Sequence, residues 1–208
     1  MECKMHGAVS STQVQQLCEL LKGLSGRPAA PFKHQEIVLK GTRAGAPTVE
    51  LKLQRSLLED LSDPQSSNRW KARLESLPMR GKANEQLAAS VRGLSEACCY
   101  GSHTLDFWKA LGFKAEYQSI QEGALFVVWQ DEHQLSVRIT CLKKVPKTGV
   151  LEQAVPVTPD FWLVEVFLVV TTDVPAQLES LYGEACKAIA GFAAKVKDLV
   201  VLKKTDAR

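Results

Sequence analysis

The sequence lacks any apolar run that approaches the roughly 18 residues needed to cross a bilayer. Its first residues include Glu2, Lys4 and His6, so they also lack the apolar stretch of a secretory signal. A charge excess is missing too, because 26 Lys and Arg stand against 23 Asp and Glu, a net charge of +3. Nucleic-acid-binding proteins usually concentrate basic residues on one face. We therefore expect neither a membrane association nor direct, sequence-specific nucleic-acid binding.

Catalytic signature motifs are missing as well. The sequence contains no G-x-S-x-G string and no Cys-x-x-Cys pair. A phosphate-binding loop of the form G-x-x-x-x-G-K-[ST] fails at Gly81-Lys82, because Ser76 and Ala83 occupy its first and last positions. No paired spacing links the histidines, which we interpret as ordinary polar residues: His6, His34, His103 and His133. The sequence thus predicts no catalytic residues, no cofactor and no metal.

Six cysteines are present, but their spacing does not suggest disulfides. Cys98 and Cys99 are adjacent on a predicted strand, so their side chains should point to opposite faces. With His103 they form the nearest approach to a metal-binding cluster, yet residues on opposite faces cannot share one ion. The other four are scattered within apolar patterns, where a free cysteine behaves as a small hydrophobe. We expect six reduced thiols in a reducing compartment, the nucleus or the cytosol.

Period-two alternation of apolar and polar residues predicts most of the strands. The clearest cases are residues 48–53 and 135–141, where each apolar residue is followed by a polar one. A turn is expected near Glu122-Gly123, between two strands. The remaining strands are expected at residues 1–10, 34–40, 70–74, about 89–100, 113–117, from 124 onwards, 161–170 and 199–202.

Apolar stripes with helical spacing predict three helices. One follows Ser10-Ser11, and one of these serines is expected to cap it. A short helix covers residues 105–111. A long one begins after Asp173, with Pro175 in its first turn.

The order of these elements predicts an α+β fold. Seven to nine strands, mostly joined by hairpin-length links, favour an antiparallel sheet. No strand–helix–strand alternation occurs, so a doubly wound parallel sheet is disfavoured. We find no internal repeat and interpret residues 1–208 as a single domain, with loops at 41–47, 58–68, 78–84 and 146–159.

A set of sequence strings in a fixed order resembles the Mediator head-module subunit 18 family, particularly its plant and green-lineage form. The most specific part is Thr104–Val128, in which "ALGF" ends a short helix and "GALF" restarts a strand. The other matching strings are Met1-Glu2-Cys3, Leu20–Leu24, "HQEIVLKG" at 34–41, "EQAVPVTP" at 152–159 and Leu199–Lys204.

This resemblance implies a closed or nearly closed antiparallel β-barrel flanked by about three helices. It also implies a non-catalytic subunit of the Mediator head, a nuclear coregulator that acts with RNA polymerase II by protein–protein interaction. The implied partners are Mediator subunit 20, as a heterodimer, and a C-terminal helix of subunit 8. The segments 43–47 and 60–68 depart from the family pattern and look lineage-specific.

The alternative function is a triphosphatase-like barrel, either a phosphohydrolase or a polyphosphate-binding protein. Such tunnels hold a divalent metal through strands with alternating glutamates. Here Glu50 and Glu165 each stand without a second carboxylate two residues away. We therefore predict no phosphohydrolase activity.

Two apolar strands are candidates for a partner-binding surface. Phe161–Val170 and Leu125–Trp129 carry more apolar side chains than one barrel interior can use. The competing interpretation is that the long C-terminal helix covers these strands within the monomer. The candidate partner-binding residues are Trp129, Trp162, Phe126 and Phe161. The basic string Lys143–Lys147 is interpreted as a solvated loop, with contact to an acidic partner as the alternative.

Overall fold

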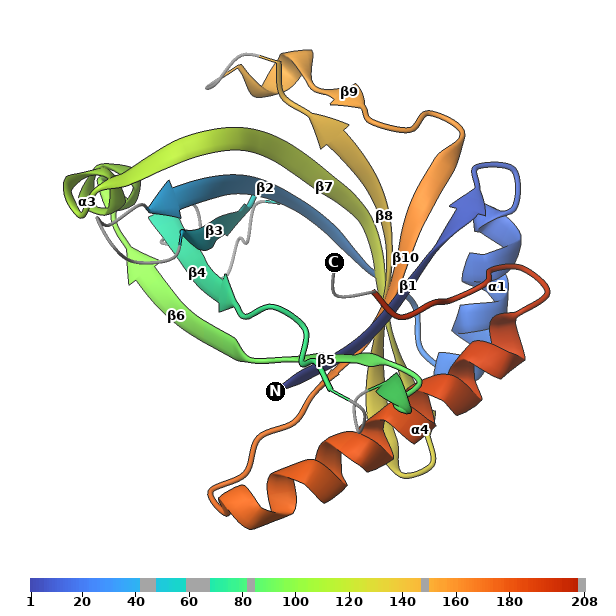
Figure 1. The fold of residues 1–208 in the computed structure, drawn as a ribbon. Coiled ribbons are helices and arrows are strands. Elements are labelled where there is room, and N and C mark those ends of the chain that lie inside the picture. Colours follow the sequence, from blue (N-terminus) through green and yellow to red (C-terminus); the bar gives the residue numbers. More distant parts are fainter. Residues whose placement is uncertain (42–47, 59–67, 82–84, 147–149, 206–208) are drawn as a thin grey trace.

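The computed structural model describes residues 1–41, 48–58, 68–81, 85–146 and 150–205. In these ranges the chain forms an antiparallel sheet flanked by helices (Figure 1), so the predicted α+β class is confirmed. The strands are β1 (Glu2–Ser10), β2 (Ala30–Gly41), β3 (Val49–Ser56), β4 (Arg69–Glu75), β5 (Ser90–Arg92), β6 (Leu94–Tyr100), β7 (Phe113–Gln130), β8 (His133–Lys144), β9 (Val155–Pro156) and β10 (Phe161–Val169). The helices are α1 (Val14–Ser25), α3 (Thr104–Ala110) and α4 (Leu178–Val196), with 3-10 turns at Leu151–Gln153 and Pro175–Gln177.

Some of the expected features lie outside the described residues. These are the lineage-specific segments 43–47 and 60–67, together with Lys82 and Lys147. In the part of the chain that the structure describes, no helix combines the length and apolar character needed to span a bilayer.

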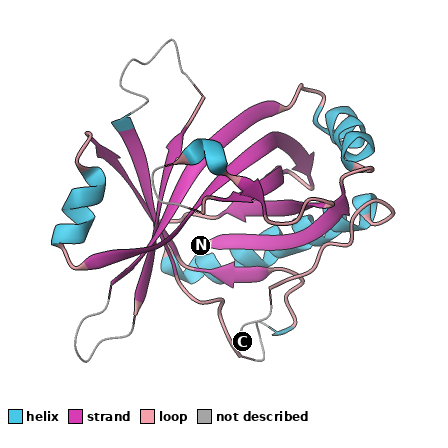
Figure 2. Cartoon of the chain, turned by 90° about the horizontal axis from the view of Figure 1, so that it is seen from above, coloured by secondary structure: helices cyan, strands magenta, loops and turns pink. Residues whose placement is uncertain are grey.

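The sheet curls on itself, but its hydrogen-bonded ladder does not run fully round. The strand order is β5-β1-β10-β8-β7-β2-β3-β4-β6, with β9 beside β8. The end strands β5 and β6 are consecutive in the chain and separated only by Gly93. Over the described residues, however, β5 pairs only with β1 and β6 only with β4. The prediction of a closed or nearly closed barrel is therefore confirmed only in part, because the sheet forms a curled half-barrel (Figures 1 and 2).

One side of the sheet is apolar and packs under α1 and α4. The α4 residues that face it recur every three or four positions, as expected for an amphipathic helix. Each large side chain that is fully buried there contributes about 1.5–3 kcal/mol. The main members of this cluster are Cys3, Met5, Phe126, Val128, Leu135, Val137, Ile139, Val164 and Val166 from the sheet, and Leu17, Leu21, Ile189 and Phe192 from the helices.

A second, smaller cluster lies between β2, β3, β4 and α3. It contains Ile37, Leu39, Leu51, Leu53, Trp70 and Ala72, with Leu105 and Trp108 of α3 packed against it. The predicted alternation of the strand at 48–53 is confirmed for Leu51 and Leu53, which are buried while Lys52 between them is not, but Val49 at the start of β3 is exposed.

The predicted turn near Glu122-Gly123 is wrong, because β7 runs without interruption from Phe113 to Gln130. Gly123 pairs with Phe32 of β2 and with Thr140 of β8, so it lies inside two ladders. A Cβ atom at this position would lie 1.9 Å from the Ile139 carbonyl oxygen. The glycine therefore permits a close approach of two backbones rather than a reversal of the chain.

Two predictions at the ends of elements are also wrong. Helix α1 has Gln13 at its N-cap with no side-chain cap, so neither Ser10 nor Ser11 caps it. The expected strand at 199–202 does not form, because Leu199 lies in a turn and the one isolated bridge of this segment joins Lys203 to His6. The segment passes very close to β1, since a Cβ on Gly7 would lie 2.5 Å from the Val201 carbonyl oxygen.

Candidate functional site

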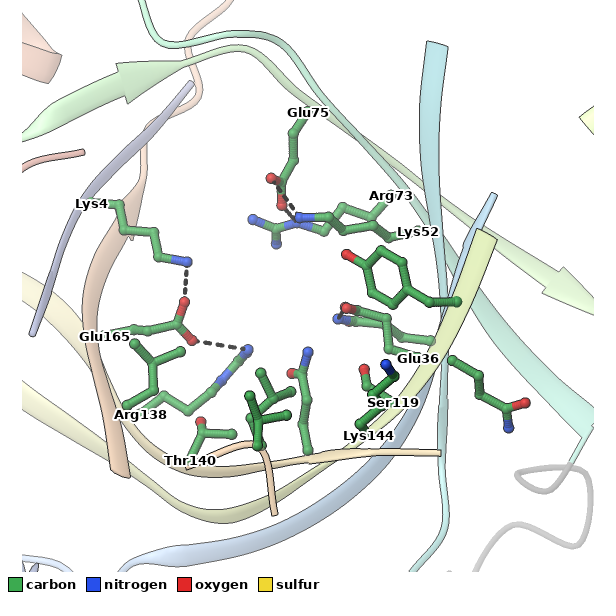
Figure 3. A pocket seen from close by; sticks show the side chains of 17 residues that line it. Lys4, Glu36, Lys52, Arg73, Glu75, Ser119, Arg138, Thr140, Lys144 and Glu165 are labelled. Carbon is green, nitrogen blue, oxygen red and sulfur yellow. Dashed lines mark hydrogen bonds and ion pairs between the residues drawn. The ribbon is translucent and has the colours of Figure 1, made fainter. Parts of the chain in front are cut away.

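The other side of the curled sheet is polar and encloses a pocket of about 400 Å³. Its wall is built by β1, β2, β3, β4, β7, β8 and β10, and the side chains of Lys4, Arg73, Arg138 and Glu165 point into it (Figure 3). Because side chains alternate along a strand, the residues between the apolar positions reach this pocket. The charged lining residues are the cations Lys4, Lys52, Arg73, Arg138 and Lys144 and the carboxylates Glu36, Glu75 and Glu165. Five cations against three carboxylates give this lining a formal charge of +2.

Glu165 organises the wall formed by β1, β8 and β10. Its carboxylate forms an ion pair with Lys4, and its Oε2 atom lies 3.8 Å from Arg138 Nη1. The Arg138 guanidinium also lies 5.4 Å from the ring centroid of Phe32 and 5.3 Å from that of Phe167. Two aromatic contacts and one long ion pair thus hold the Arg138 guanidinium in place, and the nearest carboxylate oxygen in these pairs is 3.8 Å away.

Arg73 organises the opposite wall. Its Nη2 atom donates to Glu2 Oε1 at 2.5 Å, and its Nε atom donates to Glu75 Oε1 at 2.6 Å. Arg92 repeats the pattern from β5, with 2.8 Å to Glu2 Oε2 and 2.6 Å to Glu75 Oε2. Lys52 Nζ completes the network at 3.0 Å from Glu75 Oε2. These ion pairs connect β1, β3, β4 and β5 where the hydrogen-bonded ladder is interrupted.

The carboxylates of both walls are held in their ionised form. Burial raises the pKa of Glu75, but the charges of Lys52 and Arg92 and the hydrogen bonds from Lys52 and Arg73 outweigh it and lower the pKa to about 2. Burial likewise opposes ionisation of Glu2, yet Arg73 above all lowers its pKa. For Glu165, burial is outweighed by Lys4 and Arg138, which lower the pKa. Each of these three carboxylates is thus already matched by cations of the chain.

A third part of the wall, from β7 and β8, carries donors without such partners. Lys144 lines the pocket and forms no ion pair with any described residue. The hydroxyls of Ser119 and Thr140 are buried and have no hydrogen-bond partner among the described residues. Ser119 and Lys144 are directly opposed across the β7–β8 ladder. Ser119 is also directly opposed to Glu36 across the β2–β7 ladder, so one cation and one carboxylate flank its hydroxyl.

The site offers no cluster of metal ligands. Among the described residues, no three His, Cys, Asp or Glu side chains are grouped so that they could hold an ion. Glu75 and Glu165 form ion pairs with lysine side chains of the same chain. Glu36 accepts a hydrogen bond from Gln54 Nε2 at 2.5 Å. Glu50 is not part of the pocket wall as described.

The cysteines and His103 lie away from the pocket. Cys98 is exposed and Cys99 is half-buried against the small cluster, on successive positions of β6. The His103 Nδ1 atom lies 3.7 Å from Asp106 Oδ2, on the surface. All six cysteines are free thiols.

The four aromatic candidates for partner binding lie in different environments. Trp129 and Phe161 are 64% and 52% exposed, whereas Phe126 is 2% exposed and belongs to the cluster under the helices. Trp162 is half-buried against the same cluster. Trp129 pairs with Gln134 on β8, while Phe161 precedes Leu163, which pairs with Thr140. The exposed pair is thus separated by at least six residues of β8, about 20 Å.

The sequence did not reveal the pocket. Its polar positions were interpreted as the solvent-facing side of half-exposed strands. The available signal was charge of both signs on the polar side of several strands, as at Lys52, Arg138 and Glu165. Alternation shows that two sides differ, but it does not show that the polar side curls round on itself.

Fold and site together define a curled-sheet α+β protein with a charged interior and helix-covered exterior. The sequence pattern of the family described as Med18 protein matches residues 1–208. The chain is 30% identical over 205 residues to Mediator of RNA polymerase II transcription subunit 18 from Arabidopsis thaliana, covering 98% of this chain and 87% of the relative. The chain therefore belongs to the Med18 protein family.

Two solved structures share this fold. A chain in the Schizosaccharomyces pombe Mediator head module superposes with a TM-score of 0.76 at 14% identity, with 98% of each chain covered. The PH1819 protein of Pyrococcus horikoshii OT3 superposes with a TM-score of 0.54 at 8% identity, with 99% of this chain and 95% of that chain covered. At these identities the similarity concerns the fold alone.

Proposed function

We propose that this chain is a non-catalytic subunit of the Mediator head and a coregulator of RNA polymerase II transcription. The observation that carries the proposal is the family match over residues 1–208, supported by a relative named as subunit 18 of Mediator. In this proposal residues 1–208 act as one domain, the protein works in the nucleus, and it contacts neither membrane nor specific nucleic-acid sequences.

The chemistry of the pocket supports a role without catalysis. A hydrolytic metal site needs carboxylates that are free to bind an ion. Here the carboxylates of Glu2, Glu75 and Glu165 already form ion pairs with Lys and Arg side chains. The triphosphatase alternative has no comparable observation in its favour.

The proposed partners are Mediator subunit 20 and a C-terminal helix of subunit 8. Exposed aromatic residues are the usual anchors of such contacts, and a central one contributes ~2 kcal/mol or more. Trp129 is the most exposed aromatic candidate, at 64%. Phe161 is exposed, as are Val155 and Val157, and Thr158 Oγ1 donates to the Phe161 carbonyl oxygen at 3.0 Å. We propose these two places as separate contact points, whereas Phe126 and Trp162 contribute to the cluster under the helices.

Co-purification tests this function directly. The tagged full chain, captured from nuclear extract of the source cells, should bring down Mediator subunits that mass spectrometry identifies. Subunits 20 and 8 should be enriched above the others, because they are the proposed direct contacts. Recovery of the tagged chain with no Mediator subunit, at a salt concentration that keeps the complex intact, would refute the proposal.

A pair of tryptophan variants tests the contact point. Trp129→Ala should fold as the wild type does and capture less subunit 20 or subunit 8, because its side chain contributes little to the interior. Trp162→Ala is the matched control on a half-buried position. It should lower the stability of the isolated chain while leaving capture per folded molecule unchanged. If Trp129→Ala instead lowers the stability and Trp162→Ala weakens capture, Trp162 is the contact residue and Trp129 is part of the core.

A further inference from the structure

Strand β6 (Leu94–Tyr100) has one edge that no other described segment pairs with. It stands at the end of the strand order, pairs only with β4, and runs from β5 toward α3 (Figure 1). Its ladder with β4 is bounded by two backbone hydrogen bonds of 3.0 Å, from Ser76 N to the Gly93 carbonyl oxygen and from Gly101 N to the Asn68 carbonyl oxygen. Both bonds join directly opposed residues, and such pairs alternate along an antiparallel ladder. The backbone groups of every second residue of β6 therefore point away from β4: Leu94, Glu96, Cys98 and Tyr100.

This edge is open to solvent. None of these four residues has a backbone hydrogen bond to a segment other than β4 in the described part of the chain. Residues 95–98 are all exposed, although their side chains alternate between the two faces of the strand. Neither face is therefore covered along the middle of β6. The edge offers N–H donors and C=O acceptors at the spacing that another strand requires.

Strand β6 also lacks the features by which edge strands usually avoid pairing. Those features are lysines, prolines and β-bulges at the edge. The sequence of β6 contains no Lys, Arg or Pro, and its register with β4 is uninterrupted. Its one charged residue is Glu96, which forms ion pairs with Lys71 at 2.8 Å and Arg73 at 3.1 Å, both on β4. The charge of Glu96 is thus matched from within the sheet and does not guard the edge.

The face of β6 on the side of the small apolar cluster carries small side chains. Ser95 and Ala97 lie on this face, opposite Leu74 and Ala72 of β4. Leu74 is 39% exposed. A strand added beside β6 could therefore pack large apolar side chains over these small ones and cover Leu74.

The other face of β6, on the pocket side, is flanked by cations. Arg69 and Lys71 of β4 are exposed and lie opposite Tyr100 and Cys98. Arg69 Nη2 donates to Cys98 Sγ at 3.5 Å, and its guanidinium carbon lies 5.9 Å from the ring centroid of Tyr100. The Arg69 cation thus extends across β6 toward the unpaired edge. An acidic side chain on an added strand would complement it.

We propose that β6 binds an extended segment of another protein as an added antiparallel strand, with apolar and acidic side chains in alternation. The backbone groups of the four edge residues would pair with the segment, as in other proteins that bind peptides by strand addition. Its apolar side chains would cover Leu74, and its acidic ones would face Arg69 and Lys71. This surface differs from the contact points at Trp129 and Phe161 and does not depend on them.

A second copy of this chain fits the edge less well. Two β6 strands related by a two-fold axis would keep the same faces on the same side of the joined sheet. Arg69 and Lys71 of both copies would then lie on one face, where like charges repel. Strand β6 would bring only Glu96 as a carboxylate, and Glu96 is already paired.

Fluorescence anisotropy on the full chain tests this inference. The probe is a labelled seven-residue peptide in which valine and glutamate alternate, with valine at both ends. In antiparallel pairing its glutamates lie opposite the edge residues of β6, so their N–H groups point toward β6 and those of the valines point away. N-methylation of the central glutamate removes one of these bonds. N-methylation of the next valine is the matched control, and a peptide with lysine in place of glutamate tests the charge.

A pair of variants tests the same edge from the protein side. Cys98→Pro removes an N–H group that points away from β4, so the ladder with β4 is kept. Cys98→Ala is the matched control, because it removes the same thiol and keeps the N–H group. Circular dichroism checks that both variants fold. If Cys98→Pro does not fold, the two N-methylated peptides on the wild type decide the question.

We expect the wild type and Cys98→Ala to bind the plain peptide with equal affinity. Cys98→Pro should bind it at least about tenfold more weakly, because a hydrogen bond is lost and the strands are kept apart. The peptide with N-methylated glutamate should show a similar loss relative to the one with N-methylated valine. The lysine peptide should bind more weakly than the glutamate peptide, because Arg69 and Lys71 repel it.

Four results would overturn the inference. These are no binding of the plain peptide at near-millimolar chain concentration, equal affinities of the two N-methylated peptides, equal affinities of the two Cys98 variants, and equal or tighter binding of the lysine peptide. A dimer of the wild type in light scattering that Cys98→Pro abolishes would identify a second copy as the occupant instead. Capture of Mediator subunits is measured separately, so failure of this inference is distinguishable from failure of the proposed function.

Discussion

Substitution of Arg73 by methionine should destabilise this chain more than any other single change in a charged residue of the pocket wall. The Arg73 side chain is 13% exposed and contacts Glu2, Glu75 and Glu96. The Glu2 side chain is 2% exposed, so its charge has little access to water. Removing one member of a buried ion-pair network leaves the others without compensation and typically costs about 3–5 kcal/mol.

The pKa of Glu75 supports a magnitude in the same range. It falls from 4.5 to about 2 in the folded chain. At about 1.4 kcal/mol per pH unit, this corresponds to about 3 kcal/mol of favourable interaction with the ionised carboxylate. Arg73 supplies part of that interaction, through the 2.6 Å hydrogen bond to Glu75 Oε1. We therefore expect Arg73→Met to lower the free energy of unfolding by about 3 kcal/mol.

Urea denaturation followed by circular dichroism measures this difference. The matched control is Lys71→Met, two residues away on β4, which removes an exposed ion pair with Glu96. It should change the free energy of unfolding by at most about 1 kcal/mol. Equal effects of the two variants would show that the network contributes no more than a surface pair, and would refute the reasoning.

Acidification gives a second check with a defined sign. A carboxylate with a lowered pKa stabilises the folded state fully above its unfolded pKa near 4.5 and loses that contribution as the pH falls through its folded pKa. For Glu75 the window runs from 4.5 down to about 2. Over this range the wild type should lose stability and the difference from Arg73→Met should shrink. A difference that stays constant down to pH 2 would contradict the account.

Three further predictions concern other parts of the molecule. Gly123→Ala should lower the free energy of unfolding by about 1–3 kcal/mol or more, because the new Cβ atom meets the Ile139 carbonyl oxygen; in the same urea titration Gly23→Ala, in open space on α1, should raise it by about 0.5–1 kcal/mol. Alkylation of the denatured chain without reductant should modify six thiols by mass spectrometry, and a stable crosslink would contradict the free cysteines of the structure. The purified chain should release no phosphate from tripolyphosphate with manganese; release that Glu165→Gln abolishes would reinstate the triphosphatase alternative.

Strands with strict alternation were predictable where one side is buried by a helix. Residues 135–141 alternate strictly, and Leu135, Val137 and Ile139 are all buried under the helices. The turn at Gly123 was predicted wrongly because glycine serves two purposes that sequence does not separate. It permits a chain reversal, and it permits two backbones to approach closely. The contact that decides between them involves Ile139, on a different strand.

The interior of the half-barrel was beyond the reach of sequence patterns. The ion pair of Glu2 with Arg73 joins residues 71 positions apart, and that of Lys4 with Glu165 joins residues still farther apart. Local periodicity does not contain such pairings, because they depend on how strongly the sheet curls. For the same reason the sequence could not distinguish exposed Trp129 from half-buried Trp162.

This chain serves RNA polymerase II transcription as part of Mediator. Depletion of the chain from nuclear extract by a specific antibody, followed by add-back, tests it most directly. Activator-dependent transcription should fall on depletion and recover with purified chain together with the co-depleted subunits, but not with those subunits alone. Undiminished transcription after complete depletion, or full recovery without the chain, would contradict the account.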